Sequence, residues 1–214
     1  SPGRSDVTGR RIVLHEVGPR DGLQVEKNVV PTETKLRWIG ALGEAGLDVV
    51  QVGSFVHPEK VPQMADTDAL FRALTAPGAE RRGHALYSGL VLNEKGLDRA
   101  LACGVEMVCL GVSASETHSR KNTGMGTAEA TERIVATAKR AVEAGRKVQV
   151  SVQSAFGCGF EGHVPEERVL DIARAYVDAG LTTIALADTA GHAYPEQAER
   201  LYGMLLALDP RIEA

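Results

Sequence analysis

The chain has 214 residues, of which 43% are hydrophobic and 24% charged, as expected of a globular protein with a sizeable core. Its net charge of −4 offers no broad basic face for nucleic acid or an anionic membrane, and its apolar runs are too short to cross a bilayer. Three cysteines without C-x-x-C spacing argue against a disulfide framework and a zinc site. We therefore expect a cytoplasmic protein that binds neither nucleic acid nor membrane.

The N-terminal segment differs from the rest of the chain. Its sequence, SPGRSDVTGR, has no apolar core that would mark a secretory signal. We expect residues 1–10 to form a loose tail, either disordered or left over from cloning. Residues 11–214 contain no linker, low-complexity segment or shift in composition, so a single folded domain is the simplest interpretation.

Strand-like and helix-like segments alternate along this domain. Apolar and β-branched runs predict six strands, at residues 11–17, 47–55, 84–92, 105–113, 147–156 and 181–191. Amphipathic spacing predicts a helix after each strand, at residues 32–47, 65–74, 93–104, 126–145, 164–180 and 194–209. Thr32 is expected to cap the first helix. Glycines in the left-handed conformation are expected to close four helices, at Gly46, Gly104, Gly145 and Gly180.

Six strand–helix units in unbroken order indicate an α/β fold with a parallel sheet covered by helices. A doubly wound open sheet and a (β/α)8 barrel both fit this order. The segment after the first strand, GPRDGLQ, is predicted to be a loop and lacks the G-x-G-x-x-G dinucleotide pattern. Polar residues follow the strands, whereas the turns before them hold glycine and aliphatic residues. This asymmetry favours a (β/α)8 TIM barrel, with only about six units present in this chain.

Five segments resemble motifs of one enzyme family. EVGPRDGLQ, residues 16–24, resembles the opening motif of the 3-hydroxy-3-methylglutaryl-CoA lyases, which belong to the metal-dependent lyase and Claisen-condensing TIM barrels. Four later segments resemble that family's motifs in the same order: SFVHPEKVPQM (54–64), SASETHSRKN (113–122), GCGFEG (157–162) and LADTAG (186–191). The resemblance runs from about Ile12 to the end, so we interpret residues 11–214 as the catalytic domain.

The resemblance implies a divalent-metal-dependent carbon–carbon lyase that cleaves 3-hydroxy-3-methylglutaryl-CoA, or a close analogue, to acetyl-CoA and acetoacetate. It implies Mg²⁺ or Mn²⁺ as the cofactor, an acyl-CoA substrate and a homo-oligomer, with a dimer as the expected state. Asp21 matches the family's carboxylate metal ligand, and Arg20 matches its catalytic arginine. A hard cation prefers carboxylate oxygens. A guanidinium is always charged and can stabilise the enolate that forms as the carbon–carbon bond breaks.

Further candidates follow from the same resemblance. Asp188 matches a family carboxylate that could hold the arginine or the substrate, and an N-cap for the last helix is the alternative role. Five residues are expected to bind substrate: Gln24, Gln51, Ser54, Asn93 and Thr189. Gln51 departs from the family pattern, which usually has an acidic residue there, and this leaves substrate identity and activity level open. Cys158 is expected to be a buried or idle thiol.

The chain also lacks expected parts of the family's site. It contains no H-x-H, which provides the remaining metal ligands, and no counterpart of the acid cysteine. Its last residues, LDPRIEA, fall where a seventh strand would begin. We expect the 214-residue chain alone to have little or no lyase activity and the complete protein to be a lyase. Two alternatives remain: a sister Claisen-condensing or aldolase-type enzyme acting on an α-keto acid, and a non-catalytic fragment or assembly module whose open sheet edge pairs with another chain.

Overall fold

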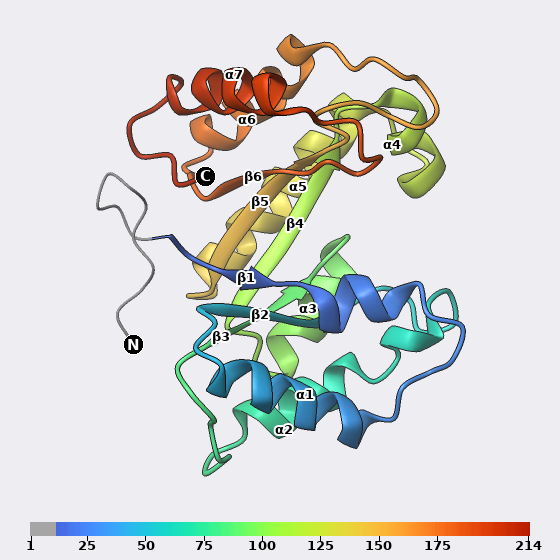
Figure 1. Ribbon diagram of the computed structural model, residues 1–214, viewed down its shortest axis with the longest axis vertical. Helices are drawn as coiled ribbons and strands as arrows, with labels where there is room; N and C mark the ends of the chain where they lie inside the picture. The colour runs from blue at the N-terminus through green and yellow to red at the C-terminus, as the bar shows by residue number, and fades with distance from the viewer. Residues whose placement is uncertain (1–11) are drawn as a thin grey trace. The chain divides into compact units, whose positions relative to one another are not determined.

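Strands and helices alternate through the computed structural model, which describes residues 12–214 (Figure 1). The predicted tail, residues 1–10, lies outside the described part. The chain is divided into two compact units, residues 1–108 and 109–214. Each unit repeats the predicted order of a strand followed by a helix.

The first unit contains a parallel sheet whose strands follow the order of the chain. Its three strands are β1 (His15–Glu16), β2 (Val49–Ser54) and β3 (Leu86–Leu90). Three α-helices follow these strands: α1 (Thr32–Glu44), α2 (Thr67–Thr75) and α3 (Glu94–Ala102). Parallel strands need such crossover connections, because each strand must start again from the same edge of the sheet. Helices α1 and α2 lie on the same side of the sheet (Figure 1).

The second unit has the same organisation, and its first strand begins two residues before the boundary. Its strands are β4 (Met107–Ser113), β5 (Lys147–Gln153) and β6 (Ile184–Leu186). Its helices are α4 (Glu116–Thr123), α5 (Thr127–Glu143), α6 (Glu166–Asp178) and α7 (Pro195–Leu206). Glu213 pairs in parallel with Thr183 beside β6, where a seventh strand is expected to begin. The N–H of Ile184 donates to the Glu213 carbonyl at 2.9 Å.

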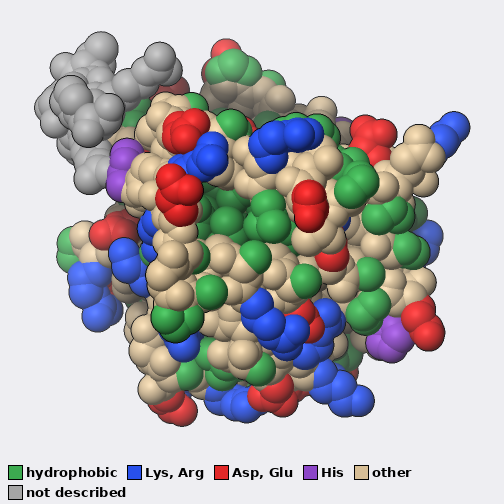
Figure 2. Space-filling model, turned by 90° about the horizontal axis from the view of Figure 1, so that it is seen from below, with side chains coloured by type: hydrophobic (Ala, Val, Ile, Leu, Met, Phe, Trp, Pro, Cys, Tyr) green, Lys and Arg blue, Asp and Glu red, His purple; other side chains and the backbone are tan. Residues whose placement is uncertain are grey.

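Each unit buries aliphatic and aromatic side chains between its sheet and its helices. Completely buried examples are Ile39, Val50 and Phe71 in the first unit, and Val150, Tyr176 and Leu201 in the second. Burial of this apolar surface is the main favourable contribution to folding. On the face of the molecule seen in Figure 2, positive and negative side chains are interspersed, with no broad area of one sign.

The sequence predicted the kinds of element well and some boundaries poorly. The four predicted glycines adopt the left-handed conformation, with φ between 74° and 85°. The predicted strand at 11–17 is wrong in length, because only His15 and Glu16 pair with β2. Thr32 is the first residue of α1 rather than its cap, a position taken by Pro31. Helix α4 and a short 3-10 helix, η2 (Pro62–Met64), were not predicted.

Candidate active site

Arg20 and Asp21 lie on a five-residue π-helical turn, η1 (Gly18–Gly22), directly after β1. The predicted irregular loop is therefore wrong. The N–H of Leu23 donates to the Gly18 carbonyl, and Pro19 opens the turn without leaving a backbone donor unpaired. The Gly18 N–H donates to Glu16 Oε1 at 2.6 Å, which fixes the entry to the turn. Single π turns occur often at functional sites.

The η1 turn directs its two charged side chains into different surroundings. Arg20 Nε donates to Gln51 Oε1 at 2.5 Å, and Arg20 Nη1 donates to Asp21 Oδ1 at 2.7 Å. The Arg20 side chain is 17% exposed, whereas the Asp21 side chain is 64% exposed. The guanidinium is thus held from two sides, while the carboxylate stays accessible to a ligand.

A β-bulge in β2 brings Gln51 and Ser54, three positions apart, to one face of the sheet. Register partners share a face, and neighbours along a strand alternate between faces. Gln51 pairs with Ser88, and after the bulge Ser54 pairs with Leu90, two residues further along β3. A Cβ on the intervening Gly89 would touch a side chain of α2, so Gly89 faces the helices. Gln51 and Ser54 therefore share the opposite face, called here the inner face; bulges often re-aim side chains beside active sites.

A second polar pair lies on the inner face. His15 Nε2 is 2.8 Å from Ser88 Oγ, and Ser88 is completely buried. Inward positions of small barrels are usually filled by apolar side chains. The sequence analysis missed this pair, and the available signal was a histidine directly after three aliphatic residues, 12–14, in a strand-like run.

Two other predicted substrate-binding residues of the first unit have different surroundings. Asn93 is the N-cap of α3, with its Oδ1 accepting from the Gly96 N–H at 2.9 Å. Gln24 is half-buried directly after η1. Within residues 12–214, no hydrogen bond is formed by the Gln24 side chain. Of the predicted residues in this unit, Arg20, Asp21 and Gln51 are in direct contact, and Ser54 shares the inner face with Gln51.

Asp188 and Thr189 lie in the second unit, just after β6. The two carboxylate oxygens of Asp188 accept from the N–H groups of His192 and Ala193, at 2.9 and 3.0 Å. These bonds brace the turn that leads into α7. The alternative role of Asp188 as the N-cap of this helix is wrong, because Tyr194 holds that position. Thr189 Oγ1 accepts from the N–H of Ser154 at 2.9 Å. Ser154 follows β5 with φ of 53°, a left-handed conformation that is uncommon for serine.

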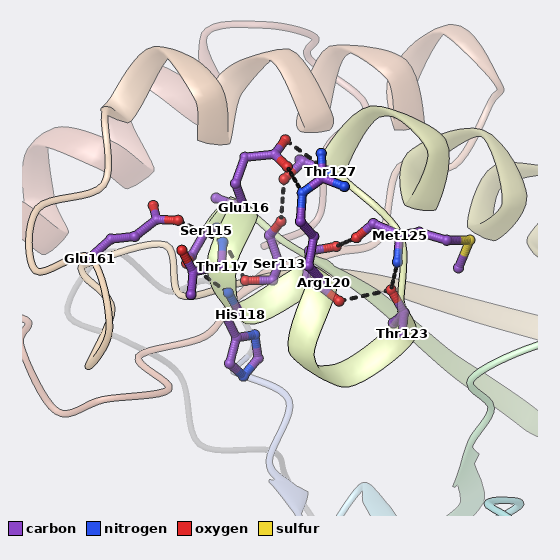
Figure 3. Close-up of polar contacts among 12 residues, drawn as sticks. Ser113, Ser115, Glu116, Thr117, His118, Arg120, Thr123, Met125, Thr127 and Glu161 are labelled. Atoms are coloured by element: carbon purple, nitrogen blue, oxygen red, sulfur yellow. Dashed lines mark hydrogen bonds and ion pairs between the residues drawn. The ribbon is translucent and has the colours of Figure 1, made fainter.

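Two of the sequence motifs meet at the start of α4 (Figure 3). The N–H of His118 donates to Ser115 Oγ at 3.1 Å, and the N–H of Thr117 donates to Glu161 Oε1 at 2.6 Å. The Thr117 bond holds the pKa of Glu161 below its usual value. Burial alone would raise the pKa of Cys158, but hydrogen bonds from Ser115 and two backbone N–H groups lower it overall. The loop at 157–162 is thereby fastened to α4.

Among the described residues, Asp21 is the predicted metal ligand and could contribute one oxygen to a metal site. Asp21 offers an exposed carboxylate, the kind of oxygen ligand that Mg²⁺ and Mn²⁺ prefer. Residues 12–214 contain no group of three or more His, Cys, Asp or Glu side chains that could hold a metal ion. Asp21 thus fits one position of such a site, and a full ligand set is not formed within the described part.

Solved structures with this fold define the class of protein. The chain matches the HMG-CoA lyase of Bacillus subtilis with a TM-score of 0.86 and 36% identity, over 93% of this chain and 65% of that one. It matches an HMG-CoA lyase from Acinetobacter baumannii, solved with coenzyme A and 3-methylmalate, with a TM-score of 0.83 and 34% identity, over 92% and 62% of the two chains. The chain is therefore part of a (β/α)8 TIM barrel, as predicted.

The profile of the HMGL-like family matches residues 11–210, and the chain belongs to this family. It is 36% identical over 201 residues to the hydroxymethylglutaryl-CoA lyase of Bacillus subtilis, and 39% identical over 187 residues to the mitochondrial lyase of Rattus norvegicus. These matches cover 94% and 87% of this chain, but 66% and 56% of the two relatives. No α-helix between residues 12 and 214 is long and apolar enough to cross a membrane.

Proposed function

We propose that the complete protein is a divalent-metal-dependent lyase that cleaves 3-hydroxy-3-methylglutaryl-CoA, or a close analogue, to acetyl-CoA and acetoacetate. The observation that carries the proposal is the Arg20 guanidinium, held by Gln51 and Asp21 directly after β1. The ends of the strands are where TIM barrels place their catalytic residues. Family membership and the lyase relatives support the same reaction class.

The proposed reaction is a retro-Claisen cleavage. The 3-hydroxyl loses its proton, carbon 3 becomes the ketone of acetoacetate, and the bond between carbons 2 and 3 breaks. Its electron pair moves onto the thioester, which becomes an enolate, and a proton added at carbon 2 gives acetyl-CoA. Arg20 stabilises the negative oxygen of that enolate, because its partners hold it in place before charge develops. Both proton transfers are assigned to groups outside the described residues.

Asp21 is proposed to contribute one ligand to Mg²⁺ or Mn²⁺. Such a cation would polarise the hydroxyl and carboxylate oxygens of the substrate. The chain's own contribution is to keep Asp21 exposed while its Oδ1 accepts from Arg20, which ties the metal ligand to the arginine. Cytoplasmic location and dimer formation remain predictions.

The test is product analysis with 3-hydroxy-3-methylglutaryl-CoA and Mg²⁺, for the complete gene product and for the 214-residue chain. We expect equimolar acetyl-CoA and acetoacetate from the former and little turnover from the latter. Arg20→Lys should lower turnover by about 10²-fold or more, as loss of an oxyanion stabiliser does. The control variant is Arg72→Lys, which changes an exposed arginine on α2 and should leave turnover unchanged. Full turnover by the Arg20→Lys variant would rule out the assigned role.

A second candidate is a sister reaction, a Claisen condensation or aldol cleavage with an α-keto acid. The observation that supports this candidate is Gln51, which places a neutral amide against the arginine. Formation of a new carbon–carbon bond from acetyl-CoA and an α-keto acid, without cleavage of 3-hydroxy-3-methylglutaryl-CoA, would decide for it.

A further inference from the structure

We propose that Ser154 is a positioning residue: its left-handed backbone directs its N–H to the hydroxyl of Thr189, and this leaves the proton of that hydroxyl for an oxygen of the substrate. Thr189 is among the residues predicted to bind substrate. That the ligand is an acyl-CoA thioester rests on the proposed function. The backbone geometry of Ser154 rests only on contacts within the second unit.

The conformation of Ser154 is the starting observation. Among residues 12–214 it is the only residue other than glycine with a positive φ, 53°. This conformation is unfavourable for an L-residue, because its Cβ comes too close to a backbone carbonyl oxygen. Ser154 is also only 1% exposed, so its surroundings hold it in this state. Backbone strain of this kind persists where the surrounding structure enforces it, and it clusters at functional sites.

The left-handed residue interrupts the hydrogen-bond ladder at the end of β5. The last regular bond of the ladder runs from the Ala187 N–H to the Val152 carbonyl, at 2.9 Å. In a regular parallel ladder, the Ala187 carbonyl would then accept from the Ser154 N–H. It accepts instead from the Ala155 N–H at 3.1 Å, as at a β-bulge whose first residue is left-handed. The Ser154 N–H is thereby diverted from the sheet to Thr189 Oγ1, at 2.9 Å.

A second hydroxyl holds the side chain of Ser154. Ser113, the last residue of β4, donates from its Oγ to Ser154 Oγ at 3.3 Å. Ser113 Oγ is itself fixed, because it accepts from the Ser115 N–H at 3.1 Å. Ser113, Ser115 and Ser154 are all buried. This contact from a neighbouring strand helps to keep Ser154 in its left-handed conformation.

The consequence falls on the Thr189 hydroxyl. A hydroxyl has one proton to donate and two positions at which it accepts. The Ser154 N–H occupies one accepting position, so the O–H bond of Thr189 must point elsewhere. In the part of the chain that the structure describes, that proton has no acceptor, and Thr189 is exposed. The hydroxyl is thus oriented before a ligand arrives, which lowers the entropy lost on binding.

Two substitutions of Ser154 separate its backbone from its side chain. Ser154→Thr keeps the hydroxyl for Ser113, but a β-branched residue resists a positive φ. Ser154→Gly loses the hydroxyl and adopts a positive φ freely. For cleavage of 3-hydroxy-3-methylglutaryl-CoA by the complete protein, we expect Ser154→Thr to raise KM about 3- to 10-fold, the worth of one hydrogen bond, and Ser154→Gly to raise it less. Loss of binding shared by substrate and transition state should change kcat little.

The same substitution in a Thr189→Val background shows whether Ser154 acts through Thr189. Thr189→Val removes the hydroxyl and should itself raise KM. Ser154→Thr should then add nothing, because the two changes disrupt one interaction. A further rise in KM in that background, or a larger rise from Ser154→Gly than from Ser154→Thr, would mean that Ser154 only braces its turn, and the inference would be overturned.

Hydrogen exchange of the complete protein, followed by NMR, tests the contact without turnover. The amide of residue 154 should be protected in the unmodified protein and in Ser154→Gly, and should exchange faster in Ser154→Thr and Thr189→Val, with the Ala155 amide as the internal reference. Unchanged protection of the Ser154 amide in Thr189→Val would refute the contact.

Dissociation constants of the thioester, measured by calorimetry, distinguish this inference from the proposed function. The expected pattern among the variants, without cleavage, would refute the lyase while the assignment of Ser154 stands. Cleavage with equal constants for the unmodified protein and Ser154→Thr would refute the assignment and leave the lyase. A complete protein that neither binds nor cleaves the thioester would overturn both.

Discussion

Replacing Lys35 by methionine is expected to destabilise the first unit and loosen the segment between β2 and α2. Lys35 is a buried cation on α1, and its Nζ donates to the Gln63 carbonyl and to Asp66 Oδ1, both at 2.6 Å. Asp66 Oδ2 also accepts from Thr32 Oγ1 at 2.8 Å. Gln63 in turn donates from Nε2 to the Glu26 carbonyl at 2.7 Å. One lysine thus connects the segment after η1, the start of α1 and the segment after β2.

The size of the effect follows from the burial of the two charges. Removing one partner of a fully buried ion pair costs about 3–5 kcal/mol, because the other charge is left uncompensated. Here the Lys35 side chain is 1% exposed and the Asp66 side chain is 20% exposed. Asp66 also keeps its bond to Thr32, so water and this hydroxyl offset part of the loss. We expect Lys35→Met to cost about 2–3 kcal/mol, and the double variant with Asp66→Asn to cost less than the sum of the single changes.

The assay is urea-induced unfolding followed by circular dichroism, with hydrogen exchange of residues 55–66 read by mass spectrometry. The matched control is Glu44→Gln, which breaks the Arg82–Glu44 pair, whose side chains are 50% and 56% exposed. Such an exposed pair is worth only about 0.2–1 kcal/mol. A Lys35→Met variant no less stable than Glu44→Gln, or with unchanged exchange at 55–66, would refute the reasoning.

Three further outcomes are expected. Gly53→Ala should lower the free energy of unfolding, measured by urea titration, by about 1–3 kcal/mol, because a Cβ there would overlap Thr67. The control is Gly203→Ala on α7, where a Cβ meets no neighbouring atom, and this variant should be equally stable or more stable. Glu161→Gln should cost about 1–2 kcal/mol at pH 7 and less as the pH falls. A carboxylate whose folded pKa is lowered contributes stability that is fully present above its unfolded pKa, near 4.5, and is lost as the pH falls through the folded pKa. A cost that does not change with pH would contradict this. Asp21→Asn should weaken binding of Mn²⁺ to the chain, measured by the free-ion EPR signal, and unchanged binding would exclude Asp21 as a ligand.

The elements that the sequence predicted are those with a local cause. Gly46 closes α1, and Gly145 closes α5, because only glycine adopts a positive φ without strain. Helix α4 was missed because its residues, ETHSRKNT, carry no apolar periodicity. Its stability comes instead from the Ser115 cap and from the Glu161 carboxylate, 44 residues away from the donating N–H. Capping from another motif is a tertiary effect that periodicity does not reveal.

Some contacts of the site likewise have a local cause, and others have a tertiary cause. The Arg20–Asp21 pair could be identified from the sequence, because the two residues adjoin in a short motif. The contact of Arg20 with Gln51 spans 31 residues, and the place of Ser54 on the same face depends on a bulge that hydrophobic alternation does not reveal. The sequence gives no local signal that Lys35 is buried, and its ion-pair partner, Asp66, is again 31 residues away. Partners that meet only in the folded chain determine these positions.

The geometry of η1 explains why an arginine and an aspartate stand side by side between two glycines. In an extended strand, neighbouring side chains point to opposite faces, so one of the two would face the helices. A π turn instead keeps both at the end of β1, with the Arg20 side chain mostly buried and the Asp21 side chain mostly exposed. A Cβ at Gly18 would displace the Glu16 carboxylate that accepts its N–H. The motif therefore specifies a backbone shape first, and the shape gives the adjacent charges different surroundings: the Arg20 guanidinium is held against Gln51, and the Asp21 carboxylate is left exposed.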